Sequence, residues 1–287
     1  MVRNRIVLVF LLLGFATQAM AEKVTLIADT NAKSAYPIGL LKLALSLSEK
    51  PYDFVFLPDS PTAKRQEEMV REGSLSVFWT STSKELEAQY QPIRIPIYKG
   101  LLGYRIFLIR KEDQPKFTKV RTLADLQGLM AGQGQYWSDT QILRKAGLAV
   151  ATSTKDEGLF YMLDGGRFDY MPRGVPEPWD EIKGHPNLNL VVEQELMLIY
   201  PSPAYFFVSR DNPQLAKDLE YGLNVAIEKG EFDRYFYSNP MIQSVLKDAN
   251  LKGRRAIRIS NPNLHEDTPL SRTELWFNPE QYEGEAR

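Results

Sequence analysis

The stretch that sets the fold is residues 23–58, KVTLIADTNAKSAYPIGLLKLALSLSEKPYDFVFLP. An apolar strand is expected over residues 23–28, ending at Asp29. Helical spacing of apolar residues follows over 37–49, and a second strand over 52–58. A polar helix over 62–73 and a strand ending at Trp79 extend the series. This β-α-β-α-β order predicts a mostly parallel sheet with helices on its faces.

A second series of the same order lies between about Gly103 and Met171. It includes the short helix TLADLQG, for which Thr122 is a plausible N-cap, and the late strand FDYM. Two extended passages, near residues 101–104 and 200–204, connect the two series. We therefore predict an α/β fold of two lobes with two mostly parallel sheets, joined by a two-strand hinge. Lobe 1 would comprise 22–102 and 200–287, and lobe 2 would comprise 103–199.

The first residues read as an export signal. Arg3 and Arg5 precede an apolar run over residues 6–15, and Ala19-Met20-Ala21 forms a small-residue cleavage motif. Ten apolar residues are too few for a membrane span, which needs about 20. We predict a signal peptide over 1–21, cut after Ala21, and hence a periplasmic protein.

Composition excludes several classes of function. The formal net charge is −1 over 287 residues, so nothing in it indicates nucleic-acid binding. The chain has no cysteine, which excludes a thiol nucleophile and thiolate metal sites. The two histidines form no metal motif, and the G-x-G in AGQGQ lacks the rest of a dinucleotide fingerprint. We expect no metal and no cofactor.

Four pieces of the chain carry a resemblance: TLADLQG, FLIRKED, GRFDYM and NPQLAKDLEYGLNVAIEKGEFDRYF. In their order and spacing they resemble the type II periplasmic solute-binding proteins of family 3, which serve amino-acid ABC transporters. The resemblance covers residues 23 to about 237. It implies capture of a small solute between two lobes and delivery to a membrane transporter. Some relatives serve sensors, and a few have become enzymes.

The chain departs from the family at the ligand site. The family's Thr-x-x-Arg motif is absent, because WTSTSKELEAQ places Glu85 three residues after Thr82. GQGQYWSD replaces the family's Gly-Thr. Arg173 stands within a residue of the aspartate that holds the ligand's amino group in the family. The usual arrangement for a free α-amino acid is therefore not kept, and the charge at this place is reversed.

Candidate site residues are polar or aromatic side chains at the carboxyl ends of expected strands, where ligands bind in open α/β sheets. Arg173 would fork onto a carboxylate or phosphate, or else pair at the surface with Glu177 or Asp180. Arg105 would supply a second anchor, or only cover the hinge. Aromatic side chains would stack on the ligand or only close the cores. The full set is Tyr36, Trp79, Thr80, Thr82, Arg105, Gln135, Trp137 and Arg173.

The sequence thus predicts a monomeric, exported binding protein that closes over a small polar, anion-bearing ligand, amino-acid-like or a carboxylate. Its partner would be a transporter permease or a membrane receptor. Two alternatives stay open. One is a sensory binding protein, and the other is a cleft enzyme of the dehydratase or lyase kind, with Glu177, Asp29 or Glu85 as its acid or base.

Overall fold

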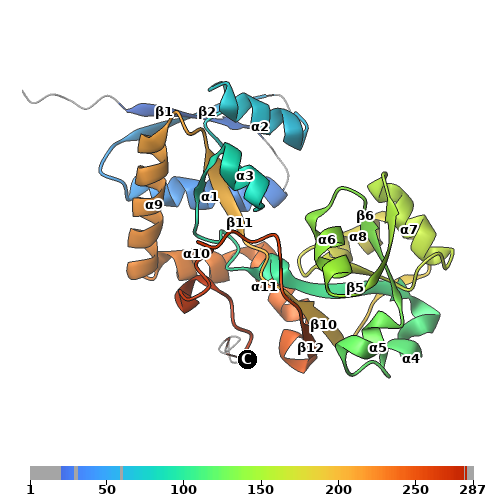
Figure 1. Cartoon of the computed structure of the whole chain (residues 1–287). Helices are drawn as coiled ribbons and strands as arrows, with labels where there is room; N and C mark the ends of the chain where they lie inside the picture. Colours follow the sequence, from blue (N-terminus) through green and yellow to red (C-terminus); the bar gives the residue numbers. More distant parts are fainter. Residues whose placement is uncertain (1–20, 29–31, 59–60, 281, 283–287) are drawn as a thin grey trace, which may run out of the picture.

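The structure of the chain is a computed structural model that describes residues 21–28, 32–58, 61–280 and 282. Two α/β bodies lie side by side, with the N-terminal elements in one and the middle of the chain in the other (Figure 1). We call them lobe 1 and lobe 2. The predicted signal peptide lies outside the described residues, except for Ala21. Asp29, named above as a candidate acid or base, also lies outside them.

Lobe 1 holds the predicted β-α-β-α-β series and the chain that returns after the second crossing. Its elements are β1 (Glu22–Ile27), α1 (Ala32–Ser46), β2 (Tyr52–Leu57), α2 (Ala63–Arg71), β3 (Val77–Ser81), α3 (Lys84–Gln89), β4 (Gln91–Ile93), β11 (Ala204–Val208), α9 (Pro213–Glu228), α10 (Glu231–Ser238) and α11 (Pro240–Asp248).

Lobe 2 holds the second series, entered through a short 3₁₀ turn at Leu101–Gly103. Its elements are β5 (Tyr104–Arg110), a 3₁₀ turn (Lys111–Asp113), α4 (Gln114–Phe117), α5 (Leu123–Gln127), β6 (Met130–Gly134), α6 (Ser138–Lys145), β7 (Ala149–Ser153), α7 (Asp156–Asp164), β8 (Tyr170–Gly174), α8 (Pro178–Gly184), β9 (Leu190–Val192) and β10 (Leu196–Ile199).

The sheets combine parallel and antiparallel pairs. In lobe 1, β1 and β2 are parallel, while β11 runs antiparallel to both β3 and β4. In lobe 2 the strand order is β12-β10-β5-β8-β6-β7, where β12 is Arg255–Arg258, and β9 also pairs with β5. Here β6 is parallel to β7 and β8, but β5 is antiparallel to β8 and β10. The strands β5 and β11, which follow the two crossings, run antiparallel to their neighbours. The sheets therefore contain more antiparallel pairs than the mostly parallel sheets that the sequence predicts.

Local sequence explains several helix starts. The Thr122 side chain accepts from the Asp125 backbone N–H, and Asp125 accepts from the backbone of Thr122 in return, which completes a capping box. The predicted N-cap of TLADLQG is therefore confirmed. Ser83 caps α3 in the same way, accepting from the Leu86 N–H at 3.2 Å.

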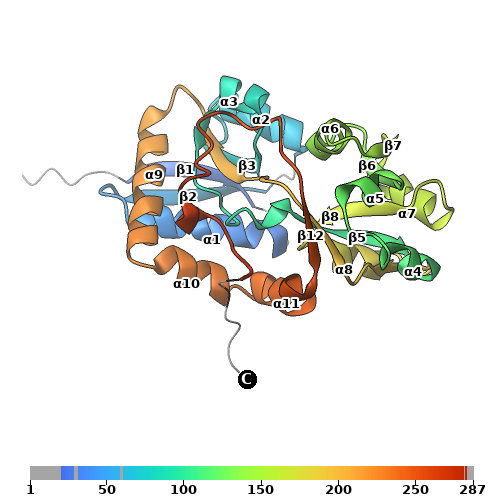
Figure 2. The same cartoon turned by 60° about the horizontal axis from the view of Figure 1, so that its bottom comes forward.

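The C-terminal fifty residues depart from the predicted division. Strand β12 (Arg255–Arg258) is not part of lobe 1, since it pairs in parallel with β10 at the edge of the lobe 2 sheet. The chain then returns to lobe 1 (Figure 2). There, Leu275 and Phe277 are buried in the core. The C-terminal segment (residues 255–277) thus forms a third connection between the lobes.

Candidate functional site

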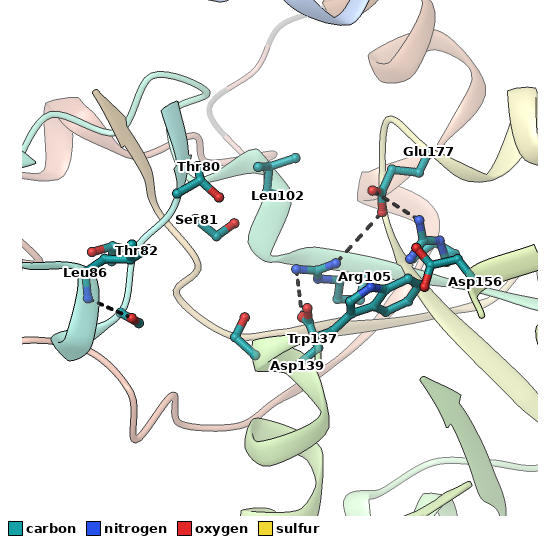
Figure 3. A pocket seen from close by; sticks show the side chains of 13 residues that line it. Thr80, Ser81, Thr82, Leu86, Leu102, Arg105, Trp137, Asp139, Asp156 and Glu177 are labelled. Atoms are coloured by element: carbon teal, nitrogen blue, oxygen red, sulfur yellow. Dashed lines mark hydrogen bonds and ion pairs between the residues drawn. The ribbon is translucent and has the colours of Figure 1, made fainter. Parts of the chain in front are cut away.

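A cavity of about 500 Å³ lies between the lobes, at the ends of their strands (Figure 3). Lobe 1 and the first crossing line it with Thr80, Ser81, Thr82, Ser83, Leu86 and Leu102. Lobe 2 lines it with Arg105, Trp137, Ser138, Asp139, Asp156, Arg173 and Glu177. Five of the eight residues predicted from the sequence are therefore brought together here: Thr80, Thr82, Arg105, Trp137 and Arg173.

The lobe 1 wall is a row of hydroxyl side chains that leaves the end of β3. Figure 3 shows the oxygens of Thr80 and Ser81 on the side that faces Arg105. The Thr82 hydroxyl is committed elsewhere, because it donates to the buried carboxylate of Glu87 at 2.6 Å. This wall therefore offers neutral hydrogen-bonding groups and no charge of its own to a ligand.

Arg105 is fixed near the start of β5, where it lies opposite Gly174 of β8. Its side chain is buried, with Nη2 at 2.8 Å from Asp139 Oδ1 and Nη1 at 3.9 Å from Glu177 Oε2. The guanidinium also lies 5.3 Å from the ring centroid of Tyr200, and its Nε has no hydrogen-bond partner among the described residues. Burial alone would lower the pKa of Arg105, but Asp139, with Tyr200 and Glu177, raises it above its usual value.

Arg173 comes from β8 and meets two carboxylates, Glu177 at the N-cap of α8 and Glu181 within that helix. Its Nε donates to both carboxylate oxygens of Glu181, at 2.9 and 3.0 Å, and its Nη2 lies 3.2 Å from Glu177 Oε1. Burial alone would lower the pKa of Arg173, but Glu177 and then Glu181 raise it. The predicted partner Glu177 is thus present, whereas Glu181 takes the place that Asp180 was expected to fill.

Trp137 lines the cavity next to the charged group of Arg173. The Arg173 guanidinium lies 4.6 Å from the centroid of its ring, within the range of a cation–π contact. The ring packs against Gly134 at the end of β6, where an added Cβ would lie 2.4 Å from the indole. Gly134, the second glycine in GQGQYW, therefore has a steric role, since it leaves room for the tryptophan.

Both signs of charge meet in the cavity. Two guanidinium groups face three carboxylates, those of Asp139, Asp156 and Glu177, so the charged lining sums to −1. The sequence suggested an anion site held by the arginines alone. The structure instead places a carboxylate beside each guanidinium.

Three predicted residues lie away from this cavity. Tyr36 is buried in the lobe 1 core, where its hydroxyl donates to the Ile97 carbonyl at 2.8 Å. Trp79 packs edge-on against Phe206, because neighbouring side chains of a strand point to opposite faces and Thr80 takes the cavity side. Gln135 lines a second cavity of about 330 Å³ that adjoins the first.

The sequence reasoning missed Leu102, Asp139 and Asp156 as cavity residues. Both aspartates open a helix that follows a lobe 2 strand, α6 after β6 and α7 after β7. The rule that ligands bind beyond the carboxyl ends of strands, applied to every strand, would have found them.

No group of three or more histidine, aspartate or glutamate side chains is arranged to hold a metal ion within the part of the chain that the structure describes. Of the acids considered for an enzyme, Glu177 lines the main cavity and Glu85 the second one. No helix among the described residues has the length and apolar character needed to span a bilayer.

Comparison by sequence finds no relative: no protein-family model matches the chain, and no curated protein matches it. Comparison of structures finds many. The probable amino-acid ABC transporter extracellular-binding protein YtmK of Bacillus subtilis aligns with a TM-score of 0.59 at 14% identity, over 78% of this chain and 100% of its own.

Two further structures align with lower TM-scores. One comes from the glutathione import system of Streptococcus mutans, GshT with the cystine ABC importer TcyBC. Its TM-score is 0.51 at 18% identity, over 77% of this chain and 95% of its own. The other is a histidine kinase sensor domain with similarity to periplasmic binding proteins, with a TM-score of 0.51 at 15% identity, over 77% and 96%. At these identities the comparisons show the fold: a two-lobed α/β chain of the type II solute-binding kind, resembling family 3.

Proposed function

We propose that the chain is an exported binding protein that captures a small zwitterionic ligand between its lobes and delivers it to a membrane transporter. The observation that carries this proposal is the cavity of about 500 Å³, which both lobes line and which holds two guanidinium groups among three carboxylates. Its volume falls within the roughly 300–1,000 Å³ typical of small-ligand sites.

The charge arrangement favours a ligand with both signs, as an amino acid has. A ligand carboxylate would bind the guanidinium groups of Arg173 and Arg105, and a ligand ammonium would bind Glu177, which lies between them. Arg173 would keep Glu181 as a partner during this exchange. A ligand that is only anionic would meet a lining that is already net negative, and this makes it the poorer candidate.

Capture would proceed by closure of the lobes. Hydroxyls of β3 and charges of lobe 2 stand on opposite sides of the cavity, so a ligand that touches both stabilises the closed arrangement. Binding then changes the shape of the molecule, which a membrane partner can detect. We propose a transporter permease as that partner, with a sensory receptor as the alternative, since a transporter's binding protein and a sensor-kinase domain both share the fold.

Export is proposed from the N-terminal sequence, with a signal peptide over 1–21 and a periplasmic mature chain that acts as a monomer. We further propose that the ligand leaves unchanged. Incubation of a bound ligand with the protein, followed by mass spectrometry of the supernatant, should recover the ligand alone. Formation of a product would instead favour the cleft enzyme, with Glu177 as its acid or base.

The test is a thermal-shift screen of the chain from Glu22 onward with amino acids, small carboxylates, phosphorylated metabolites and polyamines. Amino acids should stabilise it most, and a ligand at 100 times its Kd adds about 2.7 kcal/mol. Arg173→Ala should abolish that stabilisation, whereas Arg65→Ala, which removes an exposed lobe 1 arginine paired with Glu68, should keep it. Stabilisation by polyamines alone, or an unchanged response of Arg173→Ala, would contradict the proposal.

A further inference from the structure

The second cavity continues the first. It is open to solvent, has a volume of about 330 Å³, and shares Ser83, Trp137 and Ser138 with the main cavity, so the two meet along the tryptophan. Ligand pockets begin at about 300 Å³, and each of these two cavities exceeds that volume. A ligand confined to the main cavity would leave the second one to water.

The second cavity has a different chemistry from the first. Its lining contains one charged side chain, Glu85, and three carboxamides, those of Gln135, Gln141 and Asn263. The amides of Gln135 and Gln141 make no side-chain hydrogen bond to any described residue, and Asn263 Nδ2 lies 3.5 Å from the Ser138 carbonyl. Each carboxamide offers a donor and an acceptor side by side, which is the complement of another amide group.

Three parts of the fold build this cavity together. Ser83 and Glu85 come from the start of α3 in lobe 1, and Gln141 comes from α6 in lobe 2. Asn263 belongs to the C-terminal segment, which is fixed at the second crossing by a 2.8 Å bond from Asn261 Nδ2 to the Pro201 carbonyl. The cavity therefore lies across the same gap between the lobes as the main site.

We propose that the second cavity is a subsite for an amide-linked arm, so that the ligand is a dipeptide or an amide conjugate of similar size. This rests on the proposed function, since it places the ligand's carboxylate at Arg173 and Arg105. The nitrogen that faces Glu177 in a free amino acid is then the peptide N–H, which can still donate to that carboxylate. The peptide group otherwise lies among the carboxamides, and the N-terminal ammonium faces Glu85. The ring of Tyr136, 82% exposed at this cavity, offers a flat surface to the terminal side chain.

The experiment compares each free L-amino acid with the dipeptide in which L-alanine is joined to its amino group. Titration calorimetry with the chain from Glu22 onward should find a dipeptide that binds at least about tenfold more tightly than its free amino acid, because two or more hydrogen bonds are added. Gln141→Ala and Asn263→Ala should each weaken that dipeptide by about three- to tenfold and leave the free amino acid unchanged. Gln243→Ala, on an exposed face of α11, should change neither.

The outcomes separate the two proposals. Binding of amino acids with no gain for any dipeptide would overturn the subsite and leave the proposed function standing. A dipeptide gain that survives both Gln141→Ala and Asn263→Ala would also overturn the subsite. If neither series binds, the proposed function fails together with the subsite.

Discussion

Both arginines of the cavity, Arg105 and Arg173, already pair with carboxylates of the protein. A ligand carboxylate must therefore share or replace these partners. Glu177 lies within 4 Å of both guanidinium groups and its Oε2 accepts from the Gly174 N–H at 2.6 Å. Its side chain is 31% exposed, against 17% for Glu181, so Glu177 is the carboxylate that a ligand can reach. A ligand ammonium can therefore share Glu177 without leaving Arg173 unpaired.

The Arg105–Asp139 pair should behave as a buried ion pair. Arg105→Met leaves the Asp139 carboxylate, 13% exposed, without its ionic partner, and we expect a loss of about 3 kcal/mol in unfolding free energy. The double variant Arg105→Met with Asp139→Leu should recover much of that loss, since both charges are gone. Urea denaturation of the wild type, the two single variants Arg105→Met and Asp139→Leu, and the double variant measures this. Additive losses in the double variant would show that the two side chains do not interact.

Asp169, in the stretch GRFDYM, should give the protein part of its acid sensitivity. Partial burial alone would raise the pKa of Asp169, but Lys116 and the Met130 N–H, which donates at 2.7 Å, bring it below its usual value. The unfolded chain therefore binds a proton more readily than the folded chain. The contribution to stability is present above the unfolded pKa of about 3.9 and is lost as the pH falls through the lower folded value.

Unfolding free energy measured from pH 6 to pH 2 should accordingly fall less steeply in Asp169→Asn than in the wild type. Asp211→Asn, at an exposed position in lobe 1, serves as the control and should follow the wild type. Parallel curves for wild type and Asp169→Asn would contradict the assignment.

Helices α1 and α9 approach so closely in lobe 1 that only glycine fits between them. An added Cβ on Gly222 of α9 would lie 1.9 Å from the Ala44 carbonyl oxygen of α1. Backbone cannot yield as a side-chain tip can, so Gly222→Ala should destabilise the protein by about 1–3 kcal/mol despite the better helix propensity of alanine.

Gly184, the last residue of α8, is the matched control. An added Cβ there meets nothing within 4 Å, so Gly184→Ala should be neutral or stabilising by up to about 1 kcal/mol. Thermal unfolding of both variants distinguishes the two environments. Equal melting temperatures would mean that α1 and α9 separate without cost.

Elements with a clear apolar period were predictable, and those without one were not. The strand and helix patterns of residues 23–79 reappear as β1 to β3, and the Thr122 cap as a capping box. Strand β12 is only RAIR, which has no apolar run, and it forms because the edge of β10 is open to it. Such a strand depends on its partner, so its own residues cannot predict it.

The site followed the same logic. Strand ends are fixed by topology, and this brought Thr80, Trp137 and Arg173 to one cavity. Aromatic character alone favours Tyr36 and Trp79 as site residues, but the orientation of a side chain on its strand or helix decides which face it serves. The carboxylate beside Arg105 could not be predicted from the sequence, because Asp139 lies 34 positions away and only the fold brings it close. Glu177, four positions after Arg173, was predictable as a partner.

Both lobes depend on the C-terminal segment, which contributes a strand to one and core side chains to the other. Its β12 closes one edge of the lobe 2 sheet, while Leu275 and Phe277 fill the lobe 1 core. Lys99 of lobe 1, 4% exposed, donates to the Glu274 carbonyl at 2.6 Å and holds the segment there. Unfolding of lobe 1 releases this segment and so removes support from lobe 2.

We therefore expect one calorimetric unfolding transition for the chain from Glu22 onward and two for a variant that ends at Ile259. Loss of two buried side chains of this size costs about 2–5 kcal/mol each, and lobe 1 should melt first. The double variant Leu275→Ala with Phe277→Ala should show the same order in milder form, whereas Asp211→Asn, at an exposed position in lobe 1, should match the parent. A single transition in both variants, at the parent temperature, would show that the segment lies against lobe 1 without stabilising it.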